Sequence, residues 1–516
     1  MRTVVVLMDT LRRDFLRCYN PETSCLTPNI SRFAEECCRF DSHYVGSMPC
    51  MPARRDIFCG RLNFLERSWG PIEISDTTLP KTLFERGGVR SHMITDHAHY
   101  FRIGGENYCQ QFTTYEFFRG QESDPWVSLI DDPWEPEEYF GSVKRQYQAN
   151  RTRITKESEY SSVQCFDAAR QWVEDNRGAK DFMLMVETFD PHEPFNVPQE
   201  YLDQYGDDYA GPFYELPKYH ARDEETDEAM AHLRRRYQAL ITMTDKHFGE
   251  FIDSLKAADM YDDTLIIFTT DHGYCLGERE YIGKNYMPLY NEIANIPLLV
   301  HFPGGEYAGE ARAQITQNID LMPTILEYQG VEIPESVVGK SLRAVVERQE
   351  QIHDYALFGT FGCAVNVFDG THVYMRGGRR PDCCHEYTTS LTTIRNWLGK
   401  DDAAKIECGR YLNRVQFPVY RVPSGPQALM EDGTLANTDH LFDVRNDPGQ
   451  TVEVRDESVH EEMEELLRRA MLENDAPDDQ FERLEWGCGG KVGPFPTLQV
   501  PGSDGTAPGS CSPDCS

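Results

Sequence analysis

Three short apolar runs, each of a strand's length, lie within the first 270 residues: Thr3 to Met8, Phe182 to Val186 and Thr264 to Phe268, and Val89 to Thr95 is a fourth, strand-like segment. Continuous apolar runs are typical of strands buried on both faces of a parallel sheet. Amphipathic, helix-like segments lie between them. This β–α alternation predicts a doubly wound α/β fold, with a mostly parallel central sheet and helices on both faces.

The predicted helices run from Ile30 to Arg39, from Ser162 to Asn176 and from about Glu225 to Ala258. The last of these carries apolar residues at helical spacing. A further strand is predicted from Ile296 to Phe302, and a helix begins at Asn318-Ile-Asp and stops at a glycine. Residues from about 100 to 160 are aromatic, acidic and irregular, which indicates an excursion over the sheet.

The pattern changes near residue 350, where alternating strands and one helix follow. We therefore expect a catalytic α/β domain over 1–350, including the excursion at about 100–160, and a smaller α+β domain over 351–486. The last stretch, 487–516, is rich in Gly, Pro, Ser and Cys, and we expect it to be disordered.

Each of these four segments is followed by ionisable residues. Because the carboxyl ends of parallel strands meet at one edge of a sheet, we expect these side chains to lie together. A set of Asp and His residues at one point is typical of a divalent metal site. The residues are Asp9, then Asp96, His97 and His99, then Asp190 and His192, and finally Asp271 and His272.

The charge and composition of the chain limit the classes of molecule that it is expected to bind. The formal charge of −34 excludes nucleic acid and anionic membranes as expected partners, since both need concentrated Lys and Arg. No apolar run reaches the ~20 residues that span a bilayer. The N-terminal apolar run passes directly into Asp9 with no cleavage site, so it predicts a core strand and a cytoplasmic protein. The 16 cysteines are expected to be mostly reduced.

One short segment combines unusual residues at a predicted helix start. Cys50-Met-Pro-Ala-Arg54 is followed by Cys59-Gly-Arg61. This pattern closely resembles the signature of the sulfatase family, a branch of the alkaline phosphatase superfamily in which the cysteine is oxidised to formylglycine. The resemblance extends from residue 3 to about 450. It includes the blocks Asp190-Pro-His-Glu-Pro-Phe195 and Tyr261 to Gly273 and the later Gly283-Lys284.

The resemblance implies a metal site and a cofactor. Asp9, Cys50, Asp271 and His272 would hold one divalent metal, Ca²⁺ being the ion of the family. Cys50 would be present as formylglycine, which requires a formylglycine-generating maturation enzyme as a partner. One hydroxyl of the aldehyde hydrate would attack sulfur and expel the alcohol. Loss of a proton from the second hydroxyl would then release sulfate and restore the aldehyde.

The resemblance also implies roles for three cationic or basic residues. Arg54 would stabilise the hydrate or its oxyanion. His192 and Lys284 would bind the substrate anion, and one of the two would protonate the leaving oxygen, with His192 the natural candidate near neutral pH.

Three departures from the family pattern concern the anion and the metal. The common pair of aspartates is Asp9-Thr10 here, and the common Asp-Asn is Asp271-His272. An imidazole donor shifts the preference towards Mn²⁺ or Zn²⁺ and is similar to the phosphonate monoester hydrolase branch. The usual Lys-x-His is replaced by Asp96-His97-Ala98-His99, so that His97 or His99 would take the place of a substrate-binding lysine.

Three interpretations follow. The first is a sulfatase that hydrolyses a carbohydrate or aryl sulfate ester. The second keeps the fold and the formylglycine but acts on a phosphonate or phosphate monoester or a phosphodiester. The third is a metal-binding protein without catalysis, which the intact Arg54, Asp271-His272 and Lys284 disfavour.

Overall fold

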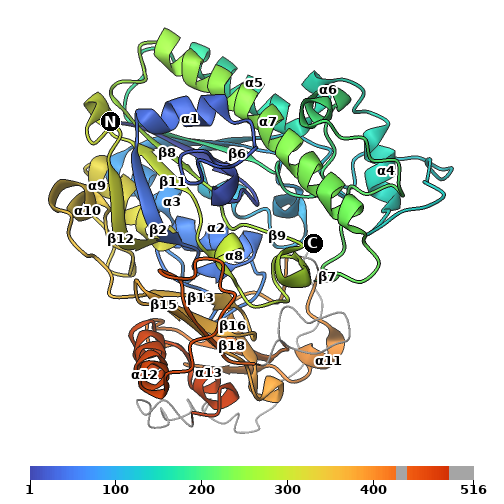
Figure 1. Ribbon diagram of the computed structural model, residues 1–516. Coiled ribbons are helices and arrows are strands. Elements are labelled where there is room, and N and C mark those ends of the chain that lie inside the picture. The colour runs from blue at the N-terminus through green and yellow to red at the C-terminus, as the bar shows by residue number, and fades with distance from the viewer. Residues whose placement is uncertain (395, 426–437, 487–516) are drawn as a thin grey trace, which may run out of the picture.

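The computed structural model describes residues 1–394, 396–425 and 438–486. An eight-stranded sheet forms its centre, in the order β12-β2-β11-β8-β1-β6-β4-β5 (Figure 1). Strand β11 runs antiparallel to both neighbours, and the other adjacent pairs are parallel, which confirms the predicted sheet. The strands are β1 (Arg2–Met8), β2 (Cys38–Tyr44), β4 (Arg90–Thr95), β5 (Thr114–Phe117), β6 (Phe182–Thr188), β8 (Thr264–Thr269), β11 (Leu298–His301) and β12 (Ala311–Gln317).

Helices cover both faces of this sheet, and the central strand shows why. Val4, Val6 and Met8 of β1 pack on one face with α1, α5 and α7. Val5 and Leu7 point to the other face, where α2, α3 and α9 pack. Alternate side chains of a strand point to opposite faces, so a continuous apolar run is buried on both. These helices are α1 (Pro28–Glu35), α2 (Cys50–Cys59), α3 (Leu79–Gly87), α5 (Ser161–Asp175), α7 (Asp227–Ala257) and α9 (Leu321–Tyr328).

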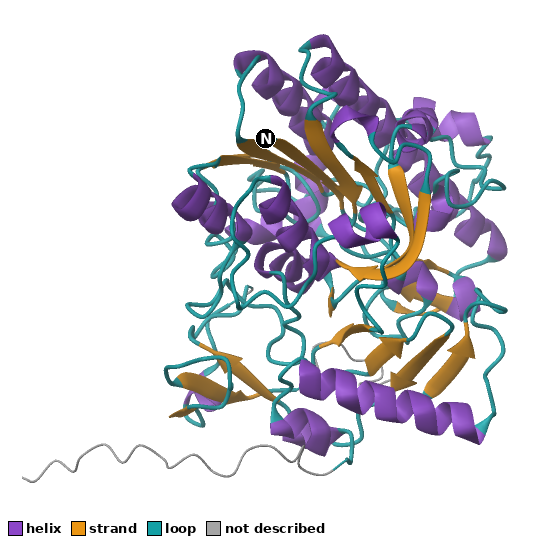
Figure 2. Ribbon diagram, turned by 90° about the vertical axis from the view of Figure 1, so that its left-hand side faces the viewer, coloured by secondary structure: helices purple, strands orange, loops and turns teal. Residues whose placement is uncertain are grey.

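A second, five-stranded sheet lies below the first, in the order β19-β15-β14-β13-β3 (Figures 1 and 2). Four of its strands come from the C-terminal part of the chain, and α12 (Glu457–Glu473) packs against them. The fifth, β3, directly precedes Cys50 and pairs with β13. The strands are β3 (Ser47–Met48), β13 (Ala356–Thr360), β14 (Val365–Phe368), β15 (His372–Arg376) and β19 (His440–Asp443).

The remaining elements are short. Two further sheets, each of three strands, have the orders β7-β10-β9 and β16-β18-β17. Their strands are β7 (His220–Ala221), β9 (Cys275–Leu276), β10 (Tyr281–Gly283), β16 (His385–Thr388), β17 (Glu407–Gly409) and β18 (Val419–Pro423). The short helices are α4 (Arg145–Arg151), α6 (Gln199–Leu202), α8 (Asn291–Ala294), α10 (Arg343–Arg348), α11 (Lys400–Ala403) and α13 (Asp478–Arg483). In the described ranges, no helix has the length and apolar character needed to cross a membrane.

Two predicted segments differ from the structure. The helix expected from Ile30 to Arg39 ends at Glu35, and β2 begins at Cys38. Cys38-Arg-Phe-Asp41 alternates between buried and partly exposed residues, which is the period of a strand. The excursion near 100–160 contributes β5, the edge strand of the main sheet, rather than lying wholly over it. The segment expected to be disordered, 487–516, lies outside the described residues.

Candidate active site

The ends of neighbouring parallel strands bring the first acidic residues together. Strand β1 pairs with β8 so that Leu7 is opposite Thr269. Asp9 follows β1 and Asp271 follows β8, and both carboxylates are fully buried. The main-chain N–H of Thr10 donates to Asp271 Oδ1 at 3.0 Å, and its hydroxyl donates to Asp9 Oδ1 at 2.7 Å. Thr10 therefore ties the two strand ends to each other.

Cys50 reaches the same place from the start of α2. All ten residues of this helix are buried, and Gly60, in the left-handed conformation, ends it. Asp56 fixes the entry to the helix, because it accepts hydrogen bonds from the main-chain N–H and the hydroxyl of Ser47. The pairing of Ser47 with β13 holds this entry from the other side. The result is a rigid platform with the Cys50 side chain at its first position.

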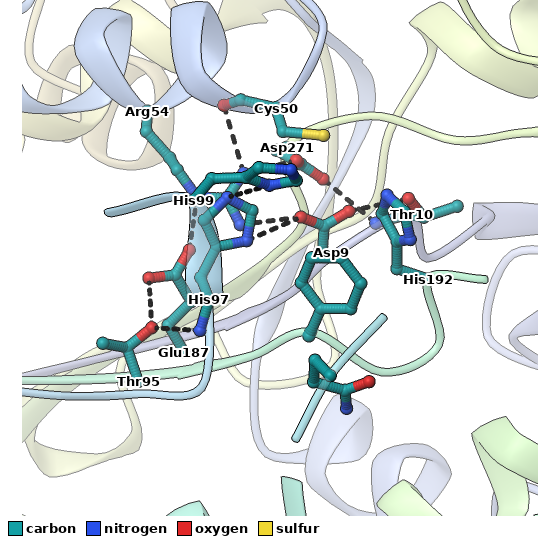
Figure 3. Close-up of polar contacts among 12 residues, drawn as sticks. Asp9, Thr10, Cys50, Arg54, Thr95, His97, His99, Glu187, His192 and Asp271 are labelled. Carbon is teal, nitrogen blue, oxygen red and sulfur yellow. Dashed lines mark hydrogen bonds and ion pairs between the residues drawn. The ribbon is translucent and has the colours of Figure 1, made fainter. Parts of the chain in front are cut away.

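The four residues expected to hold a metal lie together in the structure. One donor atom from each of Asp9, Cys50, Asp271 and His272 lies within 4.8 Å of all the others. Cys50 Sγ is 3.2 Å from His272 Nε2. Figure 3 shows Cys50 above the two carboxylates, with Arg54 entering from the next turn of the helix.

Arg54 is the only cation in direct contact with the carboxylates of this cluster in the described part of the chain. Its guanidinium donates to Asp9 Oδ2 at 2.8 Å and to Asp271 Oδ2 at 2.6 Å, and it also pairs with Glu187. A further bond reaches the main-chain oxygen of Cys50 at 3.1 Å. The side chains of Arg54 and its three acidic partners are all inaccessible to solvent. A planar guanidinium with five donors suits this arrangement, which a lysine could not reproduce.

The two carboxylates influence each other's protonation. Burial and the nearby Asp271 raise the pKa of Asp9 well above its usual range. Burial also acts on Asp271, but His272 and Arg54 outweigh it and hold the pKa of that carboxyl below its usual range. Two carboxylates at one site separate in this way because like charges cannot both ionise freely. A divalent cation would relieve this repulsion, so the donor set fits a metal.

The imidazole of His272 is also prepared for a metal. Its Nδ1 lies 3.0 Å from the carbonyl oxygen of Gly273, which can only accept, so Nδ1 carries the proton. The lone pair is then on Nε2, which faces Cys50 Sγ and lies 3.3 Å from Asp271 Oδ2. Burial lowers the pKa of His272 to about 3, so the ring is neutral at pH 7. Histidine ligands are typically oriented by such a bond from the second ring nitrogen.

A cavity of about 580 Å³ opens above Cys50, and His192 and Lys284 line it. His192 Nδ1 donates to the main-chain oxygen of Glu193 at 2.5 Å, and burial and Lys284 lower the pKa of His192 well below its usual value. Burial acts against the charge of Lys284, but Cys50 and Glu193 outweigh it and raise its pKa. Lys284 therefore brings a fixed positive charge to the cavity, whereas the imidazole of His192 is neutral at pH 7.

The two histidines of the Asp96-His-Ala-His99 segment occupy different positions. His99 lines the cavity. His97 is fully buried behind it, with Nε2 3.3 Å from His99 Nδ1 and Nδ1 3.6 Å from Asp9 Oδ2. The structure thus places His99 where it can contact a substrate and His97 where it can position His99 and Asp9 (Figure 3).

The contacts that several residues make in the site could not be inferred from the sequence. Glu187 follows the apolar run of β6 and pairs with Arg54, and its charge carries no signal until that arginine is placed. Thr10 Oγ1 accepts from Lys284 Nζ at 3.1 Å, where the family pattern has an aspartate. Gln121, from the excursion, donates to both Asp96 and Asp190 at 3.2 and 3.0 Å. A single amide thus links the segments that carry the site histidines.

The pKa of the buried Asp96 carboxyl can be tested through the pH dependence of stability. Burial and Asp190 raise the pKa of Asp96 to about 7, whereas an unfolded aspartate titrates near 3.9. The folded protein therefore retains a proton that the unfolded chain has lost, and stability falls as pH rises between these values. We expect Asp96→Asn to remove this fall, so that the free energy of unfolding declines with pH less steeply than in wild type, by roughly 1.4 kcal/mol per pH unit in this window. Urea unfolding from pH 4.5 to 7.5 measures this, and parallel curves for both proteins would contradict it.

Comparison with known proteins agrees with this geometry. Residues 2–331 match the family model for sulfatases. The choline-sulfatase of Rhizobium meliloti (strain 1021) is 27% identical over 389 residues, 67% of this chain and 73% of that protein. The multifunctional alkaline phosphatase superfamily protein PehA of Trinickia caryophylli is 27% identical, over 66% of this chain and 76% of that protein.

Solved structures share the fold over more of the chain. The phosphonate monoester hydrolase SpPMH from Silicibacter pomeroyi has a TM-score of 0.63 at 19% identity, over 92% of this chain and 96% of that one. A protein solved with its substrate D-glucosamine-2-N,6-O-disulfate also has a TM-score of 0.63, at 17% identity, over 92% of this chain and 98% of that one. The C-terminal sheet and helix are thus part of the shared fold.

Proposed function

Because this chain belongs to the sulfatase family and is a sulfuric ester hydrolase, we propose that it hydrolyses a carbohydrate or aryl sulfate ester through a formylglycine at position 50. The observation that carries this proposal is the convergence of Asp9, Asp271 and His272 on Cys50, which itself lines the cavity. A maturation enzyme would have to convert the cysteine to the aldehyde.

The residues around Cys50 fit a divalent metal. Two carboxylates, a neutral imidazole and the side chain at position 50 would hold it. When bound, the metal would supply positive charge that lowers the pKa of a hydroxyl at position 50 and draws electron density from the substrate. Ca²⁺ is the ion expected of the family, and the nitrogen donor of His272 favours Mn²⁺ or Zn²⁺.

Three side chains of the site would have separate roles in the reaction. Lys284 binds the sulfate oxygens with its fixed charge. His192 projects into the same cavity with Nδ1 already bonded to the main chain, so Nε2 is available to the leaving oxygen. A bound anion raises the pKa of His192, because negative charge stabilises the imidazolium, and the ring can then deliver a proton. Arg54 holds Asp9 and Asp271 in position beneath Cys50.

A second candidate function is hydrolysis of a phosphonate or phosphate monoester or a phosphodiester. The Asp271-His272 pair favours it, as does the fold likeness to a phosphonate monoester hydrolase. Both candidates use the same nucleophile and differ in the charge and shape of the anion at Lys284 and His192.

Matched aryl substrates separate the two candidates. Purified protein whose Cys50 peptide has been analysed by mass spectrometry is given 4-nitrophenyl sulfate and bis(4-nitrophenyl) phosphate, with Ca²⁺, Mn²⁺ or Zn²⁺ after chelator treatment. We expect sulfate ester turnover to dominate and to require a divalent metal. Dominant phosphodiester turnover would select the second candidate. Metal-independent turnover would remove the proposed metal site.

A further inference from the structure

The cavity above Cys50 has a chemically distinct outer end. Its inner lining, Cys50, His192 and Lys284, is buried. Its outer lining is accessible and includes the exposed side chains of Lys144 and Lys218. A sulfate held at the inner end would leave the alcohol part of a substrate at the outer end.

Positive charge gathers at this outer end. Among the described lining residues there, Arg102, Lys144 and Lys218 are cationic, and Glu122 is the one carboxylate. Over the whole chain the balance is the reverse, with 85 acidic residues against 51 Lys and Arg. A local cluster of positive charge can attract anions to the cavity even though the protein as a whole is negatively charged.

The acidic residues of the cavity are already engaged. Lys144 Nζ lies 2.5 Å from Glu122 Oε1, and His99 Nε2 lies 3.8 Å from Glu122 Oε2. Glu193 pairs with Lys284 at 3.8 Å and accepts from the Tyr219 hydroxyl. Neither carboxylate is therefore available to a cationic alcohol. In contrast, Lys218 makes no ion pair within the described residues.

The backbone holds the two lysines on adjoining segments. Ser142 N–H donates to the carbonyl of Leu216 at 2.8 Å, and each of these residues lies two positions before one of the lysines. Gly141 lies in the left-handed conformation, and a Cβ there would come within 2.2 Å of the Leu216 oxygen. On the same wall, the Ser123 hydroxyl has no hydrogen-bond partner among the residues described. The cavity lining therefore carries the ammonium of Lys218, the Lys144–Glu122 ion pair and the hydroxyl of Ser123.

We propose that this outer end is a second anion subsite, in which Lys144 and Lys218 bind a carboxylate or second sulfate on the alcohol part of the substrate. The inference rests on the proposed sulfatase function and narrows it to sulfate esters of acidic alcohols. The hydroxyl of Ser123 would donate to the same anion. Because the lysines are accessible, the contribution of the subsite should weaken as ionic strength rises.

The test uses substrate pairs that differ only in this charge. The substrates are O-sulfates of 4-hydroxyphenylacetate and 4-hydroxyphenylpropionate, each paired with its methyl ester, and choline sulfate serves as the cationic arm. We expect wild-type kcat/KM to be about tenfold higher for at least one acid than for its ester, as for a charge-assisted hydrogen bond. Choline sulfate should be the poorest substrate.

Lys218→Gln should remove most of this preference and change the methyl esters less than about twofold. Lys144→Gln should act in the same direction, since it also leaves Glu122 facing the substrate. Lys81→Gln, an exposed lysine on α3, is the matched control and should change neither member of a pair. An unchanged ratio of acid to ester in Lys218→Gln across the series would overturn the subsite.

A binding measurement separates failure of the subsite from failure of the proposed function. Calorimetry with the unreactive Cys50→Ala variant compares the Kd of each acid with that of its ester, with and without Lys218→Gln. If the wild-type protein turned over no sulfate ester, the function would fail, and this Kd comparison would still decide the subsite. Equal Kd values for acid and ester, or tighter binding of choline sulfate, would refute it.

Discussion

Cys50→Ala is expected to abolish ester hydrolysis, with a loss of roughly 10⁴-fold or more in kcat, as when a covalent nucleophile is removed. Alanine retains the helix and the buried volume of Cβ but has no atom that can be converted to an aldehyde. Because Cys50 begins α2 and its surroundings are fixed by Asp56 and Ser47, the fold should persist. Released sulfate and the thermal unfolding midpoint are the two measurements.

Cys59→Ala is the matched control, because it makes the same change at the other end of the same buried helix. We expect it to retain activity with only a modest loss of stability. In active wild-type protein, the peptide containing Cys50 should be about 18 Da lighter than the unmodified sequence (the mass change of cysteine to formylglycine; a step of thiol oxidation chemistry). Full activity in protein with unmodified Cys50, or in Cys50→Ala, would contradict the proposed nucleophile.

Arg54→Gln is expected to cause the largest combined loss of stability and activity. It would leave the three buried carboxylates of Asp9, Glu187 and Asp271 without their shared cation. Removing one partner of a buried ion pair typically costs roughly 3–5 kcal/mol. Activity should fall by roughly 10²-fold or more, because the groups beneath Cys50 lose their fixed positions. Urea unfolding and released sulfate measure the two effects.

The pH dependence of this variant has a definite sign. Without Arg54 the carboxylates bind protons more readily, so the stability gap to wild type should shrink as pH falls towards 5. Arg55→Gln is the control: Arg55 is also buried but pairs with Asp76, away from the cluster. It should lose stability and retain most of its activity per folded molecule. Equal losses of specific activity in the two variants would show that Arg54 has no particular role at the site.

The convergence of Asp9 and Asp271 was predictable because it needs only parallel strands in neighbouring positions. Each aspartate follows an apolar run, and β1 and β8 prove to be adjacent. The arrival of Cys50 at the same point could not be inferred from periodicity, because it depends on how a loop and α2 cross the sheet. The family resemblance supplied that residue, and the structure brings the four donor atoms together.

Other parts left no readable pattern. Strand β5 has four residues, of which three are exposed, so neither length nor alternation distinguishes it from a loop. The sheet of β16, β17 and β18 is equally short. Lys144 and Lys218 are ordinary surface lysines in the sequence, and only the pairing of their segments places both on one cavity. Such residues are defined by tertiary contacts rather than by local sequence.

The pairing of β3 with β13 has a consequence for synthesis of the chain. Ser47 and Met48 lie opposite Gly359 and Thr360, so the entry to α2 lacks its partner strand until most of the polypeptide has left the ribosome. In the finished protein Cys50 is only 2% exposed. The growing chain thus presents this thiol for a long interval and then encloses it. Under the proposed function, oxidation by a maturation enzyme would have to occur in that interval, before β13 pairs with β3.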